Sequence, residues 1–208
     1  MATTLKKPPY IETVGAQYIC FNTPGTNGEY TSNYETEVSK FKTVKNVSVT
    51  EGVETTEIYA SGEIYDEKRG LQYDDISEEV IAVDAATLHK MRGDIVDNGG
   101  LIFSGGPAGR PYFAYGKVVY LSGGKMRLDW YPKCKLVENS DEAGSSEKNF
   151  SEQTANMTIR AYPFNENKNT KTSVDSDVNW PENLTEEKFF TKPILTVEDL
   201  AAAATKGA

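Results

Sequence analysis

The sequence predicts a mainly β fold, an antiparallel β-sandwich or partly closed barrel with one short flanking α-helix, long loops and an extended C-terminal arm. About eight or more runs are rich in β-branched and aromatic residues and are bounded by Gly, Pro, Asn or Asp. Only one segment carries both the start and the end signals of a helix. Strands and helices do not alternate and no fixed-period repeat occurs, which excludes parallel α/β and solenoid folds.

The first half of the chain predicts strands separated by turns. A strand, a loop and a second strand are expected in the first forty residues, because aromatic residues there flank the turn-rich segment 22–28. Alternation from Val47 to Val53, followed by the β-rich run 58–65, predicts strand, turn, strand. The charged segment 66–70 predicts an exposed turn, and 76–83 a further strand.

The second half begins with the best helix candidate. Asp84 is a good N-cap, basic residues fill the last turn, and Gly93 is a good C-terminal stop, so a helix is expected over 85–92. The segment 122–125 contains two glycines and predicts a hairpin turn between strands over 112–121 and 126–137. One more strand is expected over 155–162.

Residues 1–162 are therefore expected to form one β-sandwich domain, and residues 163–208 an extension or arm, ordered or partly disordered. The extension is rich in Asn, Lys, Thr and acidic residues, with apolar anchors at Trp180, Phe189-Phe190 and Ile194-Leu195. A chain of 208 residues is long enough for one core without a metal or disulfide. Cys20 and Cys134 are expected to be free, buried thiols.

The composition excludes several classes of function. A net charge of −9 argues against a protein whose main surface grips nucleic-acid phosphates. No apolar run approaches the length of a membrane helix, and the N-terminus shows no secretory signal, so a membrane anchor is not expected.

Motifs for catalysis and cofactor binding are weak or incomplete. His89 has no serine or cysteine motif around it, and a structural role is favoured. Lys125 lacks the spacing of a phosphate-binding loop, and 105–109 lacks that of a dinucleotide loop. The acidic runs match neither a calcium loop nor an assignable glycosidase pair. We therefore expect no enzyme activity, no catalytic residue, no metal and no cofactor.

Charge is distributed unevenly along the chain. Between Tyr34 and Glu79 there are twelve acidic and five basic residues, whereas between Leu101 and Val137 there are six basic and one acidic. Two differently charged solvent-exposed faces of one domain would explain this pattern. Self-association would explain it as well, because an acidic face of one copy can meet a basic face of the next in a head-to-tail contact. The candidate contact residues are Arg110, Lys117, Lys125, Arg127, Lys133, Asp74 and Asp75.

Several segments together resemble the major tail protein of long-tailed bacteriophages, the tail-tube protein of the siphophage type. They are Tyr59-Ala60-Ser61, the helix ending at Gly93, Asp97-Asn98-Gly99-Gly100, Pro111-Tyr112-Phe113-Ala114-Tyr115-Gly116 and Arg127-Leu128-Asp129-Trp130-Tyr131-Pro132-Lys133. The resemblance runs in order from Val47 to Tyr162. The chain departs from the family pattern in the polar stretch 138–152 and after Pro163.

The resemblance implies a structural virion protein whose hexameric rings stack into a tail tube that conducts DNA. Its implied partners are further copies of itself, a tape-measure protein, a tail terminator and tail-tip or initiator proteins, with DNA only in passage and assembly in the host cytoplasm. An acidic lumen suits such a conduit because it repels phosphates. Candidate lumen-lining residues lie between Val47 and Val83, and alternation allows only some of them to face inward: Glu51, Glu54, Glu57 and Glu63.

Two other functions remain open from the sequence. One is a β-sandwich module that binds carbohydrate or a receptor, for which Trp130-Tyr131 could offer a stacking platform, although packing in the core or an interface is favoured there. The other is a tube protein of a contractile or secretion-type injection machine, which would deliver protein in place of DNA.

Overall fold

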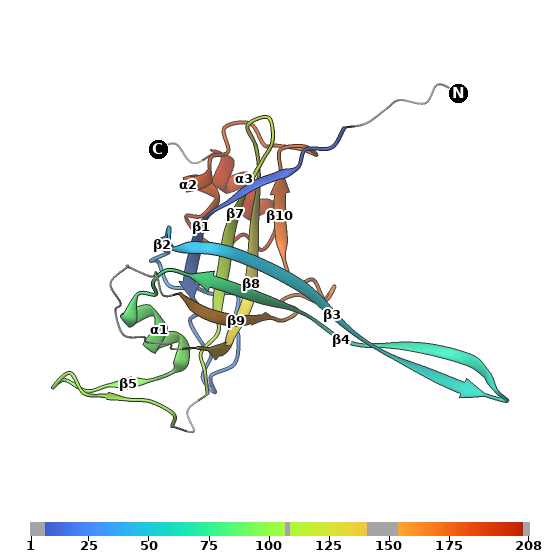
Figure 1. Ribbon diagram of the computed structural model, residues 1–208, viewed down its shortest axis with the longest axis horizontal. Coiled ribbons are helices and arrows are strands. Elements are labelled where there is room, and N and C mark those ends of the chain that lie inside the picture. Colours follow the sequence, from blue (N-terminus) through green and yellow to red (C-terminus); the bar gives the residue numbers. More distant parts are fainter. Residues whose placement is uncertain (1–6, 107–108, 141–153, 206–208) are drawn as a thin grey trace, which may run out of the picture.

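The computed structural model describes residues 7–106, 109–140 and 154–205, with the backbone alone at 53–56, 67–69 and 71 (Figure 1). The strands in chain order are β1 (Ile11–Phe21), β2 (Ser39–Phe41), β3 (Val44–Ala60), β4 (Glu63–Val80), β5 (Ile95–Val96), β6 (Ile102–Phe103), β7 (Phe113–Leu121), β8 (Lys125–Asn139), β9 (Ala155–Ala161) and β10 (Thr172–Asp175). The helices are α1 (Ala85–Arg92), α2 (Glu186–Phe189) and α3 (Val197–Thr205).

One antiparallel sheet, in the order β2-β1-β7-β8-β9-β4-β3, forms the body of the protein. The long strand β8 divides it, because its second edge pairs with β10 over Arg127–Trp130 and with β9 over Cys134–Asn139. Since β3 follows β2 after two residues, the sheet curls until its last strand approaches its first. Within the described residues no ladder joins β3 to β1 or β2. The predicted antiparallel sandwich or partly closed barrel is confirmed.

The inner face of the curled sheet encloses the first of two apolar clusters. Inward side chains alternate along each strand, as the pleat requires. Helix α1 contributes Met91, which is fully buried, and Leu88 packs at the edge of the cluster. The strands contribute Ile19, Phe21, Ile76, Val80, Phe113, Tyr115, Tyr131, Cys134, Leu136, Met157, Ile159 and Ala161.

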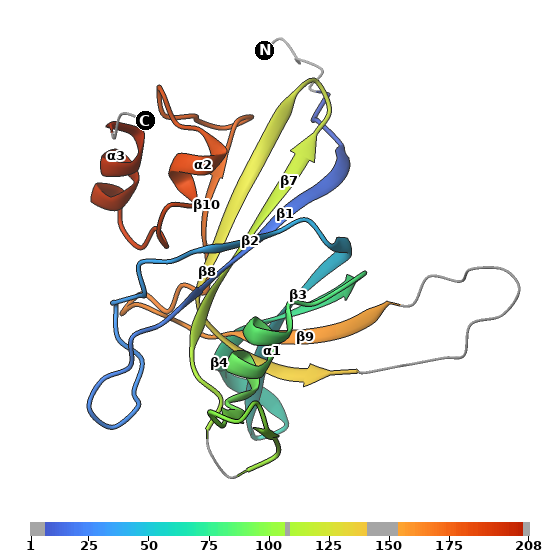
Figure 2. The same cartoon turned by 90° about the vertical axis from the view of Figure 1, so that its left-hand side faces the viewer.

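The outer face of β1, β7 and β8 carries the second cluster, which the C-terminal segment covers. Figure 2 shows β10, α2 and α3 beside β7 and β8, away from α1. Phe190 stacks on Tyr18 with ring centroids 3.8 Å apart and meets Trp130 edge-on. The predicted extended arm is therefore wrong for residues 163–205, which share a core with the sandwich. The anchors Phe189, Phe190 and Ile194 are buried, and their burial binds the segment to the sheet.

Helix α1 forms as its end signals predict. The Asp84 carboxylate accepts from the Thr87 amide at 2.9 Å, which satisfies a free amide of the first turn. Gly93 closes the helix in the left-handed region at φ 74°, and its amide donates to a carbonyl of the last turn. The hairpin between β7 and β8 and the strand β9 are also confirmed.

The hairpin of β3 and β4 differs from its prediction. The turn expected over 66–70 is strand, and the chain reverses at Ser61-Gly62, where both residues have positive φ. Positive φ at both central residues is the geometry of a type I′ hairpin turn. The run 66–70 was predicted as a turn because it is charged and shows no apolar alternation, and Asp66 and Gly70 at its ends are exposed.

Candidate assembly surfaces

The outer half of the β3–β4 hairpin projects beyond the body of the protein (Figure 1). Strand β4 pairs with β9 over Asp74–Val80, and among the described residues, 53–72 form a ribbon of two strands without a third. A two-stranded ribbon is marginally stable alone in water, and the outer edge of β3 offers unpaired backbone groups along much of its length. The ribbon is therefore suited to pair with a strand of a partner.

Apolar side chains at the tip of this hairpin lie in solvent. Ile58 is 37% exposed, Tyr59 63%, Ile64 58% and Tyr65 79%. Clustered exposed apolar residues on a projecting element mark an interaction surface more often than single scattered ones do. The tip has features of a contact surface that the isolated chain leaves uncovered.

The pairing register of the hairpin indicates on which face three of the four predicted lumen-lining residues lie. The ladder has register shifts between Val53 and Thr55 and between Ile58 and Tyr59, and at both the extra residue lies in β4. Counted along β3, Glu51 and Glu57 therefore share the face that continues the inner surface of the sheet. Glu63 pairs with Ala60 and belongs to the opposite face. The side chain of Glu54 lies outside the described part of the chain. One face of the ribbon thus carries two of the candidates and the other face a third.

A second, shorter hairpin also exposes apolar residues. Within the described ranges, strands β5 and β6 pair only with each other, and both are two residues long. Their exposed side chains include Ile95, Val96, Leu101, Ile102 and Phe103. Figure 2 shows this hairpin at the end of the molecule beside α1.

A basic–aromatic face, defined here as Tyr30, Tyr112, Lys133, Lys135 and Tyr162, lies on the outer side of β8. The Lys135 ammonium is 4.1 Å from the centre of the Tyr112 ring, and the Lys133 ammonium is 5.0 Å from that of Tyr30. Tyr112 also meets Tyr30 and Tyr162 edge-on. The rings hold both ammonium groups by cation–π attraction, and this arrangement presents positive charge on an apolar platform.

The other predicted contact residues are distributed over several environments. Lys117 and Asp74 are only 6% and 2% exposed, so their side chains lie inside the subunit. Three of the others form ion pairs within the chain: Lys125 with Asp177, Arg127 with Asp129, and Asp75 with Arg160. The Arg110 guanidinium donates to the carbonyls of Leu136 and Val137. The contacts between subunits that these residues were predicted to make remain predictions.

A row of buried polar groups crosses the inner face. The Gln17 amide, with its nitrogen turned toward β4, donates to both oxygens of Glu78 at 3.2 and 3.0 Å. Burial raises the pKa of the Glu78 carboxyl to about 7, while Tyr115 and Lys117 act to lower it. Burial also lowers the pKa of the Lys117 ammonium, against the effect of Asp129 at 3.8 Å. Burying these polar and charged groups costs free energy, and the hydrogen bonds and charges that they offer one another offset part of that cost.

Asp74 lies on the same inner face as Glu78. Burial raises the pKa of its carboxyl, and the Thr170 hydroxyl donates to Oδ2 at 2.5 Å. Its Oδ1 has no hydrogen-bond partner in the part of the chain that the structure describes. Glu51 pairs with Asp74 across the ladder, so acidic groups extend along this face toward the projecting ribbon.

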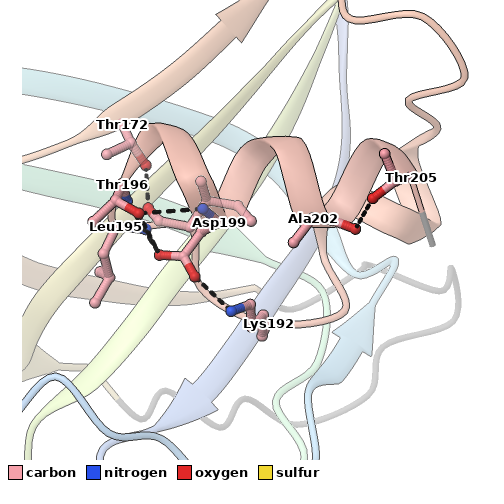
Figure 3. Close-up of polar contacts among 8 residues, drawn as sticks. Thr172, Lys192, Leu195, Thr196, Asp199, Ala202 and Thr205 are labelled. Atoms are coloured by element: carbon pink, nitrogen blue, oxygen red, sulfur yellow. Dashed lines mark hydrogen bonds and ion pairs between the residues drawn. The ribbon is translucent and has the colours of Figure 1, made fainter.

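A groove of about 700 Å³ lies where the turn before α3 meets the loops 32–36 and 164–165. Asp199 lines this groove. Its carboxylate caps α3, because it accepts from the amides of Leu195 and Thr196 at 3.2 Å, and it pairs with Lys192 (Figure 3). The Thr196 hydroxyl accepts in return from the Asp199 amide at 3.2 Å. The polar groups shown there already hold the helix end in place.

The residues that the sequence offered for catalysis, a disulfide or sugar binding lie in the following surroundings. His89 Nδ1 lies 2.7 Å from Asp94 Oδ2, just past the end of α1. Cys20 and Cys134 are free and buried, as expected. Trp130 and Tyr131 are buried and offer no stacking platform for a sugar. Among the described residues we find neither a cluster of side chains able to hold a metal ion nor a helix long and apolar enough to cross a membrane.

The exposed apolar tip was not predicted from the sequence. A signal was present, because Ile58-Tyr59 and Ile64-Tyr65 stand symmetrically about Ser61-Gly62. Apolar pairs at equal distance from a turn-forming dipeptide indicate a hairpin tip.

Comparison with known proteins identifies no family. No protein-family model matches the chain, and no curated protein matches it in sequence. Among solved structures, a chain of the anti-feeding prophage baseplate, determined by cryo-electron microscopy with six-fold symmetrisation, aligns over 84% of this chain and 97% of its own. The two are 11% identical, with a TM-score of 0.33. This likeness is too weak to establish a shared function.

Proposed function

We propose that this chain is a structural virion protein that assembles with copies of itself into stacked hexameric rings, forming a phage tail tube through which DNA passes. The observation that carries the proposal is the projecting β3–β4 ribbon, with its open edge and exposed apolar tip. Pairing such ribbons between neighbours in a ring would remove the open edges and bury the tips. The resemblance of the sequence to siphophage tail-tube proteins supports the same role, which involves no catalysis.

The charge of the ribbon fits a conduit. Between Val44 and Val80 there are ten acidic and three basic residues. A lumen that repels phosphates lets DNA slide, whereas a basic lumen would hold it. The face that carries Glu51 and Glu57 is the better candidate for the lumen, because it continues the acidic inner surface through Asp74. Tape-measure, terminator and initiator proteins are the further partners of this proposal, and the virion tail, assembled in the host cytoplasm, is its location.

The proposal is tested by negative-stain electron microscopy of the purified chain, alone and with a tail-initiator complex. We expect rings or tubes. The matched control replaces residues 53–72 by Asn-Gly, which joins Gly52 to its ladder partner Tyr73 through a favoured hairpin turn and leaves the body of the sheet intact. A control variant that assembles as well as the full chain, or monomers of the full chain even with the initiator, would contradict the proposal.

The conduit is tested separately in virions. Glu51→Lys with Glu57→Lys should slow DNA ejection from tubes of normal length, because a basic lumen binds phosphates. Glu79→Lys, on the opposite face of β4 and outside the ribbon tip, is the matched control for the lumen. Unchanged ejection in the double variant would show that this face does not line the channel. Tubes that carry protein cargo and no DNA would favour an injection machine of the same architecture.

A further inference from the structure

The two lysines of the basic–aromatic face differ from the other basic residues of the central sheet. Lys125, Arg127 and Arg160 each pair with a carboxylate of the chain. Within the part of the chain that the structure describes, Lys133 and Lys135 contact tyrosine rings and make no ion pair. Their charge is therefore left for a group outside the subunit.

The face also has a fixed form. Lys135 stands opposite Arg160 in the ladder between β8 and β9, and Arg160 in turn stands opposite Asp75 in the ladder between β9 and β4. Arg160 binds both oxygens of Asp75 at 2.7 and 2.8 Å and lies 4.3 Å from the ring of Tyr73. The neighbouring strands are thus locked, and the two lysines are presented by a rigid sheet. A rigid, partly apolar platform with free positive charge suits a carboxylate carried beside an apolar side chain.

The tip of the β3–β4 hairpin has the complementary chemistry on one of its faces. By register, Glu63 and Ile58 share the face opposite to Glu51 and Glu57, and Ile58 is exposed. The neighbouring Tyr65 is the most exposed of the four large apolar residues at the tip. A carboxylate therefore stands among exposed apolar groups at the end of the ribbon.

The tip cannot reach the basic–aromatic face of its own chain. The ribbon continues β4, which lies in the same sheet as β8, and it extends away from the body (Figure 1). Glu63 stands eleven positions before Asp74, the residue at which β4 leaves β9, and an extended strand of that length spans roughly 35 Å. A contact between tip and face must therefore join two copies.

We propose that the basic–aromatic face receives the hairpin tip of a second copy, with Glu63 of one subunit placed against Lys133 and Lys135 of the next. The proposal rests on the proposed function, in that it takes the hairpin as an assembly element. The contact is heterologous, since face and tip are different surfaces, so it propagates from copy to copy and builds rings or stacks. The contact also joins the acidic segment between Tyr34 and Glu79 of one copy to the basic segment between Leu101 and Val137 of the next.

The test is an exchange of charge between the two surfaces, with assembly of the full-length protein followed by sedimentation velocity. Lys133→Glu with Lys135→Glu, and Glu63→Lys alone, should each lower the association constant by about 100-fold or more, because like charges then meet at the contact. A mixture of these two variants should associate again, since each altered surface then finds an opposite charge. Glu57→Lys, at the same tip but on its other face, and Lys7→Glu with Lys188→Glu, away from the basic–aromatic face, should associate as the unchanged protein does. Thermal melting confirms that each variant is folded.

Each remaining outcome overturns a specific claim. If the unchanged protein assembles and the Lys133→Glu, Lys135→Glu variant assembles equally well, the contact is wrong while the structural role stands. If the mixture of folded variants stays monomeric, the pairing of these two surfaces is wrong. If a single-stranded oligonucleotide binds the monomer, and the double lysine variant loses that binding but still assembles, the face is a nucleic-acid site. If the unchanged protein never assembles, the proposed function fails first.

Discussion

Replacing Glu78 by Gln should remove a pH-dependent weakness from the inner core. The Glu78 carboxyl is buried among Gln17, Tyr115 and Lys117, and its pKa rises from 4.5 to about 7. Between these two values the folded state binds more protons than the unfolded state, so the free energy of unfolding falls as the pH rises. A shift of roughly 2.5 pKa units corresponds to about 3 kcal/mol, lost between about pH 4.5 and pH 7 and fully lost above it.

The measurement is urea unfolding of both proteins between pH 4.5 and pH 8.5. Glutamine keeps the shape and the hydrogen-bonding capacity of the neutral acid, so Glu78→Gln should match the unchanged chain near pH 4.5 and exceed its stability by about 3 kcal/mol at pH 8. Glu79→Gln is the matched control, because Glu79 lies on the other face, is partly exposed and pairs only with Lys45 at 3.6 Å among the contacts the structure gives it. Equal pH slopes in Glu78→Gln and the unchanged protein, or a less stable variant at pH 8, would refute the reasoning.

Substitutions at three further positions test the outer cluster and the helix cap. Phe190→Ala should cost about 3–5 kcal/mol in unfolding free energy, because it removes the ring between Tyr18 and Trp130 and separates the C-terminal segment from the sheet; chemical denaturation measures it. Gly116→Ala should lower the melting temperature, since a Cβ there would lie 2.6 Å from Phe190 and 3.0 Å from Trp130; an unchanged melting temperature would contradict the close packing. Asp84→Ala should cost about 1 kcal/mol through the loss of the α1 cap, whereas Asp84→Asn should restore most of it, as denaturation will show.

Local chemistry allowed much of the fold to be predicted. The cap at Asp84, the stop at Gly93 and the glycine turn between β7 and β8 are decided by a few neighbouring residues, so the sequence indicates them directly. The fold class followed from the number of β-rich runs and the single strong helix signal. The order of strands in the sheet, and the division of β8 between β9 and β10, depend on contacts between distant residues that no local pattern specifies.

The errors share a physical cause. The arm after Pro163 and the turn over 66–70 were both predicted from polarity, yet one segment packs on the core through a few apolar anchors and the other is part of strand β4. Polarity and charge alone were also insufficient to locate the candidate contact residues. Charge counts identified the acidic and basic halves of the chain, but only the structure shows that Lys117 and Asp74 are buried while Lys133 is presented on tyrosine rings.

The central claim, that the projecting β3–β4 ribbon drives self-assembly, is tested most directly by sedimentation velocity over a range of protein concentrations. The full chain and the variant with residues 53–72 replaced by Asn-Gly are compared side by side. We predict that the full chain shifts from monomer to larger species as its concentration rises, while the shortened chain stays monomeric with an unchanged melting temperature. Equal association of the two proteins would contradict the claim.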